Sequence, residues 1–406
     1  MLYEGLLERK LENWANDIKN QYNLPIELSL WNGKRFQLGS QSQPAVDMYI
    51  NSAGALPALL NASLDSLGEA YIEQQIDIKG RLSDAIQVAY KLANISQHNN
   101  GLIRKATEIL AHSKKQDREA IKYHYDVSND FYRLWLDENM VYSCGYFEDG
   151  TETLEEAQVK KIDHILRKIQ LKPGQRLLDI GCGWGALAIR AARNWGARCV
   201  GVTLSEKQYE FARERVKREG LEELVEIRLQ DYRDVQGTFE RITSVGMFEH
   251  VGLANLPEYF SKISSLLSQG GWAMNHGITS TDAESAPTPM GGSEFIDKYV
   301  FPHGELPHIS LVLKTMQACG LETFDVENLR RHYARTLDLW TQRYEAQANT
   351  LRQIVDEKTY RIWRIYLAGC SHAFHVDNVA IFQVICQKAE QESSTLPWSR
   401  HYIYKS

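Results

Sequence analysis

The sequence predicts an α/β protein, in which a doubly wound, Rossmann-like parallel sheet forms a large domain behind a smaller α+β N-terminal domain. Strand and helix patterns alternate from Gln175 onward, as they do in doubly wound sheets. A glycine-rich turn follows the first of these strands. In addition, 406 residues are too many for one ordinary core, so more than one domain is expected.

The composition excludes several classes of protein. Hydrophobic residues make up 43% and charged residues 24% of the chain, which is typical of neither a disordered nor a membrane-spanning protein. The net charge of -6 gives no general attraction to nucleic acid, so no nucleic-acid partner is expected. The first residues contain no apolar run long enough for a signal peptide, which favours a cytoplasmic protein.

The cysteine pattern indicates neither a metal site nor a disulfide framework, because no CxxC pair occurs. Each cysteine is expected to be a small buried hydrophobe. The six are Cys144, Cys182, Cys199, Cys319, Cys370 and Cys386.

Residues 1–98 are predicted to form the small α+β domain. A first helix is expected to end near Tyr22, followed by a hairpin in "IELSLWNGKRFQLG", a strand in "AVDMYIN" and helical spacing in "LPALLNASLDSLGEAYIEQQ". Residues 99–122 form a charged linker. This linker is either a solvated helix face or a basic patch that docks on anionic lipid head groups.

The large domain is predicted from residue 123 to residue 406, with its sheet starting after Gln175. Its predicted elements are strands at 176–181, 198–204, 225–231, 241–247 and 271–278 and helices at 186–195, 206–220 and 256–270. Ligands of such sheets bind above the carboxyl ends of the strands.

The glycine turn "LLDIGCGWG" is the first candidate binding element. Its GxGxG spacing differs from the GxGxxG of a dinucleotide site, while the carboxylate of Asp179 could reach an ammonium group. This combination favours S-adenosylmethionine. Asp231, at the end of the third strand, could accept from an adenine amino group, and Thr203 and Gln208 add polar groups. The second strand supplies no acid for the ribose, and such a turn can also serve only to pack a helix.

Glu249 and His276 are the second candidate site. Glu249 follows the fourth strand and His276 lies in the fifth. A right-handed crossover makes such consecutive strands neighbours. The two side chains are therefore expected to converge beside the methyl donor, where they could hold or move a proton. Taken singly, Glu249 could instead cap a helix, and His276 could be an ordinary core histidine.

A series of motifs resembles the cyclopropane-fatty-acyl-phospholipid synthases and the related mycolic acid cyclopropane synthases. In order, they are "YHYDVSNDFYRLWLDENMVYSCGYFEDG", "LLDIGCGWG", "GVTLSEKQ", "LQDYRD", "SVGMFEHVG", "NHGI", "HYARTLDLW" and "YLAGCSHAF". The resemblance covers residues 123–406. Residues 1–98, notably "SLGEAYIEQQIDIKG", also resemble the N-terminal domain of the bacterial phospholipid enzymes. The mycolic acid enzymes lack that domain, so a phospholipid substrate is favoured.

The resemblance implies a class I methyltransferase fold and a specific reaction. The methyl group of S-adenosylmethionine adds to a cis double bond of an acyl chain, and the resulting carbocation loses a proton to bicarbonate before the ring closes. In this family the bicarbonate is held by main-chain groups matching Cys144 and Ile278 and by side chains matching Glu249, His276 and Tyr333. Cys370 matches a cysteine long proposed as catalytic and is carried as a secondary candidate, because nothing nearby suggests a lowered thiol pKa.

The resemblance also assigns the contacts to S-adenosylmethionine. These fall on Tyr125, Asp126, Asp179, Gly181, Cys182, Gly183, Trp184, Gly185, Thr203, Leu204, Ser205, Gln208, Asp231 and Tyr232.

The expected partner is the surface of a phospholipid bilayer, with the protein peripheral at the inner face of the membrane. The N-terminal domain is expected to mediate a homodimer or to present lipid, and the Pro- and Gly-rich segment 284–308 to form part of an acyl channel and lid. Three alternatives stay open: a lipid methyltransferase that leaves a methylene or methyl branch, a small-amine N-methyltransferase, and a lipid-carrying or S-adenosylmethionine-sensing module.

Overall fold

The computed structural model describes residues 2–41, 43–100, 127–285, 292–302, 304–389 and 396–404. Tyr125, Asp126 and nearly all of the predicted charged linker lie outside the described residues. The chain divides into two compact units. The first comprises Met1–Thr107, Pro287–Val300 and Asn349–His372, and the second comprises Glu108–Ala286, Phe301–Ala348 and Ala373–Ser406.

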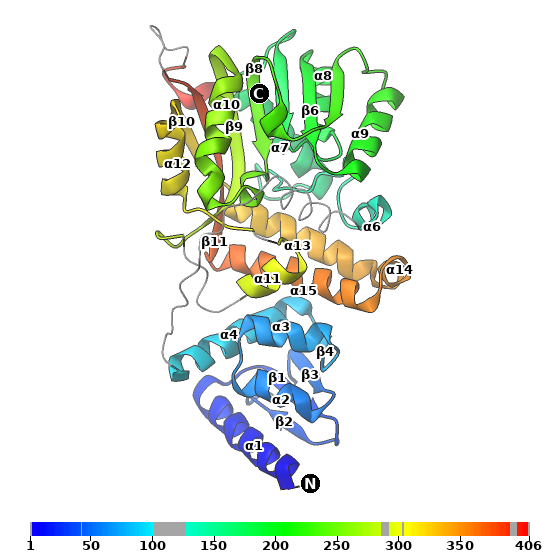
Figure 1. Cartoon of the computed structure of the whole chain (residues 1–406). Coiled ribbons are helices and arrows are strands. Elements are labelled where there is room, and N and C mark those ends of the chain that lie inside the picture. Colours follow the sequence, from blue (N-terminus) through cyan, green and yellow to red (C-terminus); the bar gives the residue numbers. More distant parts are fainter. Residues whose placement is uncertain are drawn as a thin grey trace. The chain divides into compact units, whose positions relative to one another are not determined.

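The first unit is built around a four-stranded sheet in the order β2-β1-β3-β4 (Figure 1), in which only β1 and β3 run parallel. The predicted first helix, hairpin and following strand are confirmed. Its N-terminal elements are α1 (Leu2–Tyr22), β1 (Ile26–Leu30), β2 (Arg35–Gln37), β3 (Val46–Ile50), η1 (Ala53–Ala55), α2 (Leu56–Leu60), α3 (Leu64–Ile72), β4 (Ile76–Gly80) and α4 (Leu82–Asn100).

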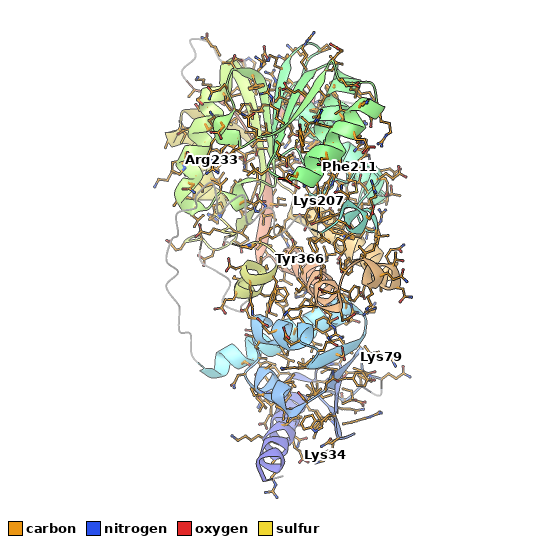
Figure 2. The ribbon with its side chains drawn as sticks, turned by 45° about the vertical axis from the view of Figure 1, so that its right-hand side comes forward. Lys34, Lys79, Lys207, Phe211, Arg233 and Tyr366 are labelled. Carbon is orange, nitrogen blue, oxygen red and sulfur yellow. The ribbon has the colours of Figure 1, made fainter. Side chains whose placement is uncertain are left out.

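Lysines lie at both edges of this small sheet. Lys34 precedes edge strand β2 and Lys79 lies in edge strand β4, and both side chains are exposed and extend away from the ribbon in Figure 2. Charged side chains at such positions discourage pairing with another strand.

Two later parts of the chain also belong to the first unit. They contain α11 (Ser293–Tyr299) and most of α14 (Ala348–Ile354) and α15 (Glu357–His375). The Asp65 carboxylate accepts from the backbone N–H of Phe295 at 2.8 Å, and Arg361 forms an ion pair with Asp77. The segment predicted as a Pro- and Gly-rich loop therefore contains a helix, and the compact first unit extends beyond the predicted residues 1–98.

The second unit contains a seven-stranded sheet in the order β10-β11-β9-β8-β5-β6-β7. All the strands predicted from the alternating pattern are confirmed and run parallel; β11 is antiparallel to both of its neighbours. The strands are β5 (Arg176–Ile180), β6 (Arg198–Thr203), β7 (Val225–Leu229), β8 (Phe239–Val245), β9 (Leu267–Ser280), β10 (Leu321–Asn328) and β11 (Val379–Lys388). The sheet is thus mostly, not wholly, parallel.

Helices cover both faces of this sheet (Figure 1). One core contains side chains of α7, α8 and α9 together with Leu177 and Met274, and the other contains side chains of α10 and α12 together with Leu178 and Ala273. Because successive strand residues point to opposite faces, His276 shares the α7 face with Met274. The remaining elements of this unit are α6 (Asn129–Arg133), α7 (Leu154–Lys168), α8 (Ala186–Trp195), α9 (Glu206–Arg218), η2 (Tyr232–Asp234), η3 (Phe248–His250), η4 (Leu253–Asn255), α10 (Leu256–Leu266), α12 (Ile309–Ala318), α13 (Arg330–Ala346) and η5 (Arg400–Ile403).

Among the helices that the structure describes, none combines the length and the apolar character needed to cross a membrane.

Candidate active site

A pocket lies at the carboxyl ends of β5, β6 and β8, around the predicted glycine turn. Gly181 and Gly183 have φ angles of +73° and +53°, which glycine adopts at little cost. A Cβ atom on Gly181 would lie 2.9 Å from Cγ of Met247, so the backbone approaches closely there. The predicted residues that line this pocket are Asp179, Gly181, Cys182, Gly183, Trp184, Thr203, Leu204, Gln208 and Tyr232.

Asp179 gives the pocket its negative group. Its side chain is buried and accepts a hydrogen bond from Oγ1 of Thr243 at 2.8 Å. Burial raises the pKa of Asp179 to about 6 and lowers the pKa of the buried Lys161 to about 8. A cationic ligand beside Asp179 would favour its ionised form, so the pocket suits the ammonium group of S-adenosylmethionine.

Other residues predicted to contact the ligand stabilise the backbone around the pocket. Thr203 Oγ1 and Gln208 Oε1 are 2.9 Å apart, which fixes the end of β6 against α9. Ser205 accepts from the backbone N–H of Gln208 and caps α9, as Ser commonly does. Gly185 has a φ angle of +83° and packs against Ala212.

Asp231 is held by a neighbouring arginine. Its carboxylate accepts three hydrogen bonds from Arg233, which is labelled in Figure 2: one from the backbone N–H, one from Nε and one from Nη2, at 2.9, 2.9 and 2.7 Å. The pocket is lined here by Arg233 itself and by its neighbour Tyr232. The predicted contact of Asp231 with an adenine amino group stays a prediction.

Glu249 lies where β8 leaves the sheet. The last backbone bond between the two strands joins the N–H of Gly246 to the carbonyl of His276 at 2.7 Å. In a continued parallel ladder the next donor, the N–H of Ile278, would meet a β8 carbonyl. Here the Oε1 atom of Glu249 accepts that bond at 2.8 Å instead. The carboxylate therefore replaces a strand carbonyl at the end of β9.

Close packing holds Glu249 in this position. A Cβ atom on Gly277 would lie 2.3 Å from the ring of Phe248, so the glycine makes room for the residue next to Glu249. Burial raises the pKa of Glu249 to about 7, although the bond from Ile278 lowers it. The Oε2 atom is buried and has no hydrogen-bond partner among the described residues.

His276 is buried beside Gln383. Its Nδ1 atom lies 3.1 Å from Nε2 of Gln383, while its own Nε2 atom is buried with no hydrogen-bond partner among the described residues. Burial, with Lys161 and Lys168 in the vicinity, lowers the pKa of His276 well below its ordinary value. The imidazole is therefore neutral, with one ring nitrogen available to a ligand.

Strand pairing and hydrogen bonds lead from Ile278 to Tyr333 and Cys144. Ile278 pairs with Ile381 in the sheet, and the carbonyl of Ile381 accepts from the N–H of Leu329 at 2.9 Å. The Leu329 carbonyl in turn accepts from the N–H of Tyr333 at 3.0 Å and lies 3.9 Å from Sγ of Cys144. Cys144 and Tyr333 thus both lie at the Leu329 carbonyl, and the convergence of the five predicted residues on one bicarbonate stays a prediction.

Cys370 has a different setting. It belongs to the first compact unit. Burial raises its thiol pKa to about 12, although the hydrogen bond with Tyr366 lowers that pKa. A thiol with that pKa is protonated at neutral pH, so it is a poor nucleophile. Its catalytic role stays a prediction.

The raised pKa of Glu249 predicts a pH-dependent cost of folding. Below its ordinary pKa of 4.5 the carboxyl group is protonated in both the folded and the unfolded state. Between pH 4.5 and about 7 it ionises in the unfolded state and stays protonated in the folded state. Stability is therefore lost as the pH rises from 4.5 to 7, by up to about 3 kcal/mol. Glu249→Gln should remove this loss, so urea unfolding in degassed buffer should show the variant gaining on the wild type between pH 5 and pH 8. An equal stability difference at both pH values would contradict the assignment.

Reasoning from the sequence did not identify Gln383, Lys161 or Phe248 as parts of the site. Gln383 carries a usable signal, because it is a polar residue inside the apolar strand "AIFQVIC", and such a residue requires a partner. The contact between Phe248 and Gly277 depends on how two strands end, which no local pattern contains.

The chain matches the sequence model of the family described as mycolic acid cyclopropane synthetase over residues 112–384. Residues 13–101 match a second family, described as a domain of unknown function.

Individual proteins match over large parts of the chain. A probable fatty acid methyltransferase of Pseudomonas putida is 44% identical over 94% of this chain and 97% of its own. The cyclopropane-fatty-acyl-phospholipid synthase of Escherichia coli K12 is 40% identical over 67% of this chain and 69% of its own. The solved structure of mycolic acid cyclopropane synthase CmaA1, complexed with SAH and CTAB, is 34% identical, covers 69% of this chain and 100% of its own, and has a TM-score of 0.65.

Proposed function

Since the chain belongs to the mycolic acid cyclopropane synthetase family and is an S-adenosylmethionine-dependent methyltransferase, we propose that it cyclopropanates unsaturated acyl chains of phospholipids with the help of bicarbonate. The observation that carries this proposal is the pair of buried, unpartnered polar atoms, Oε2 of Glu249 and Nε2 of His276. Both come from the ends of adjacent strands beside the pocket of the methyl donor.

The reaction has two chemical steps, methyl transfer and ring closure. A carbon of the cis double bond attacks the methyl group, so a C–C bond forms and the bond between methyl and sulfur breaks. The acyl chain then carries a positive charge, and S-adenosylhomocysteine leaves. Loss of a proton from the new methyl group supplies the electron pair that closes the ring. The protein must therefore hold a proton acceptor near the new methyl group and exclude water from the cation.

The site residues fit bicarbonate by their hydrogen-bonding character. Bicarbonate has one O–H donor and acceptor oxygens, and it would supply the base that takes the proton. Oε2 of Glu249 can accept from the O–H group. Nε2 of His276 can donate to an oxygen, provided that it carries the ring hydrogen. The raised pKa of Glu249 also reduces the repulsion that an ionised carboxylate would exert on the anion.

Support for a phospholipid substrate comes from the N-terminal part of the chain. Residues 13–101 match a domain of their own, and they resemble the N-terminal domain of bacterial phospholipid enzymes. Such a substrate lies in a bilayer, so the protein would work peripherally at the membrane surface. A homodimer formed through the first unit stays a prediction.

A second candidate is methylation without ring closure, which would leave a methyl or methylene branch. The 44% identical relative is described as a probable fatty acid methyltransferase, a description that covers both outcomes. The same residues would serve either reaction, because the new methyl group loses a proton in both. For a methylene branch, a hydride shift first moves the positive charge to the carbon that bears the new methyl group, and a methyl branch requires a hydride donor that then reduces this methylene.

Lipid mass spectrometry tests the proposal. The protein is incubated with monounsaturated phospholipid vesicles and S-adenosylmethionine carrying a CD₃ methyl group, with and without added bicarbonate. We expect a gain of CD₂ that resists catalytic hydrogenation and that depends on bicarbonate. A gain of CD₂ that can be hydrogenated would favour a methylene branch, a CD₂H branch on a saturated chain would favour a methylene that was then reduced to a methyl branch, and no labelled lipid would contradict the proposal.

A further inference from the structure

Gln383 is a buried amide that faces His276 across the sheet. The two residues are paired in register on the antiparallel strands β11 and β9, so their side chains point to the same face. Their exposed fractions are 0% and 1%, and the amide nitrogen lies 3.1 Å from Nδ1 of the imidazole. A buried polar pair of this kind constrains both partners.

The orientation of this amide determines which nitrogen of His276 carries the hydrogen. An amide NH₂ that donates to Nδ1 requires a lone pair there, so the hydrogen sits on Nε2, the unpartnered nitrogen. The reversed amide would accept from an Nδ1–H and leave a lone pair on Nε2. In the first case the site offers one donor and, while Glu249 is ionised, the acceptor Oε2; in the second it offers two acceptors, of which the single O–H of bicarbonate can satisfy only one.

We propose that Gln383 is a positioning residue that holds His276 in the Nε2–H tautomer and thereby makes the site a receptor for a small oxyanion. This inference rests on the proposed function, because it names the residue through which the bicarbonate subsite acquires its donor. Gln383 touches His276 and acts through it.

Burial and the charges around His276 keep its imidazole neutral, so the tautomer determines whether Nε2 is a donor or an acceptor. Lys161 and Lys168 both disfavour a charged imidazole, and His164 does so when protonated, whereas Glu327 favours it. Burial adds to the effect of the lysines. The two tautomers of a neutral ring lie close in free energy, so a hydrogen bond at Nδ1 is sufficient to select one.

The first experiment determines the tautomer of His276 by NMR and requires no enzyme activity. Protein labelled with ¹⁵N-histidine is compared as the wild type, Gln383→Met and Gln387→Met, and the signal of His276 is assigned by its loss in His276→Asn. Gln387 is the matched control, because it is also buried on β11 and donates to Glu322 at 2.9 Å. We expect an Nε2–H signature in the wild type and in Gln387→Met, and a mixture of tautomers in Gln383→Met. An Nδ1–H signature in the wild type, or no change in Gln383→Met, would overturn the inference.

The second experiment reads the oxyanion subsite. Gln383→Met should raise the KM for bicarbonate about tenfold, the lower end of the loss seen when a metal-ligating histidine loses its hydrogen-bond partner, with smaller effects on kcat and on the binding of S-adenosylhomocysteine. Gln383→Glu should raise this KM further, because a carboxylate accepts from Nδ1–H and inverts the tautomer. Unchanged bicarbonate KM values in both variants would overturn the inference. Wild-type turnover that is independent of bicarbonate would instead remove the bicarbonate step of the proposed function and leave the tautomer result standing.

Discussion

Glu249→Gln is expected to lower kcat by about 10²–10⁴-fold, the range that a positioned acid–base group contributes, and to leave the binding of S-adenosylhomocysteine unchanged. The amide oxygen can keep the hydrogen bond from the N–H of Ile278 that Oε1 accepts at 2.8 Å. The amide nitrogen, however, places a donor where Oε2 offers an acceptor. It would face the O–H of bicarbonate donor to donor, so the loss should lie in turnover and in bicarbonate use.

Glu240 supplies a matched control for this substitution. Its carboxylate also accepts a backbone bond, from the N–H of Arg176 at 2.9 Å. Glu240→Gln should retain near wild-type turnover, because this bond lies at the start of β8, at the opposite end of the strand from Glu249. Single-turnover rates and calorimetric titration with S-adenosylhomocysteine measure both variants. Equal losses in Glu249→Gln and Glu240→Gln, or a Glu249→Gln enzyme with wild-type kcat, would contradict the role proposed for Glu249.

Gly277→Ala is expected to reduce turnover about 100-fold without changing any polar group. Its Cβ atom would lie 2.3 Å from the Phe248 ring, so the ring must move and carry Glu249 with it. A misplacement of about 1 Å in a catalytic group costs about this much in rate. Overpacking of the core should also lower the free energy of unfolding by about 1–3 kcal/mol. Turnover assays and urea unfolding would measure the two effects.

Two variants distinguish a displacement of Glu249 from a general loss of stability. Gly369→Ala introduces a Cβ that meets no atom within 4 Å and lies inside α15, so it should stabilise the protein by up to about 1 kcal/mol. Adding Phe248→Leu to Gly277→Ala should recover part of the turnover by giving the new methyl group space. A Gly277→Ala enzyme as active as Gly369→Ala would show that the position of Glu249 does not depend on this packing.

Much of the second unit's sheet could be predicted from the sequence, because the signals are local. Apolar runs such as "RLLDIG" and "RCVGVT" are separated by amphipathic helices, and that alternation permits few topologies. The adjacency of β8 and β9, from which Glu249 and His276 come, followed from the same rule, and the convergence of their side chains stays a prediction. β10 and β11 were missed, because β11 pairs with β10 and with β9 across long sequence separations.

The remaining features depend on tertiary contacts between distant segments. The extent of the first unit could not be predicted, since residues 292–300 and 349–372 join it from far along the chain. The ion pair of Arg361 with Asp77 has no local pattern. Asp231 was correctly placed at a strand end, but its close engagement by Arg233 depends on side-chain geometry. Gln383 became interpretable only when the strand register placed it opposite His276.

The bond between Glu249 and Ile278 has a consequence for protein design. One carboxylate both completes the hydrogen-bond ladder of β9 and presents an acceptor to the proposed anion site. A neutral aliphatic side chain in place of Glu249 would leave the N–H of Ile278 without its acceptor and would also remove the acceptor Oε2. A designer who moves this chemistry to another scaffold must therefore transfer a prematurely ended strand along with the side chains, because the unfinished ladder is what orients the carboxylate.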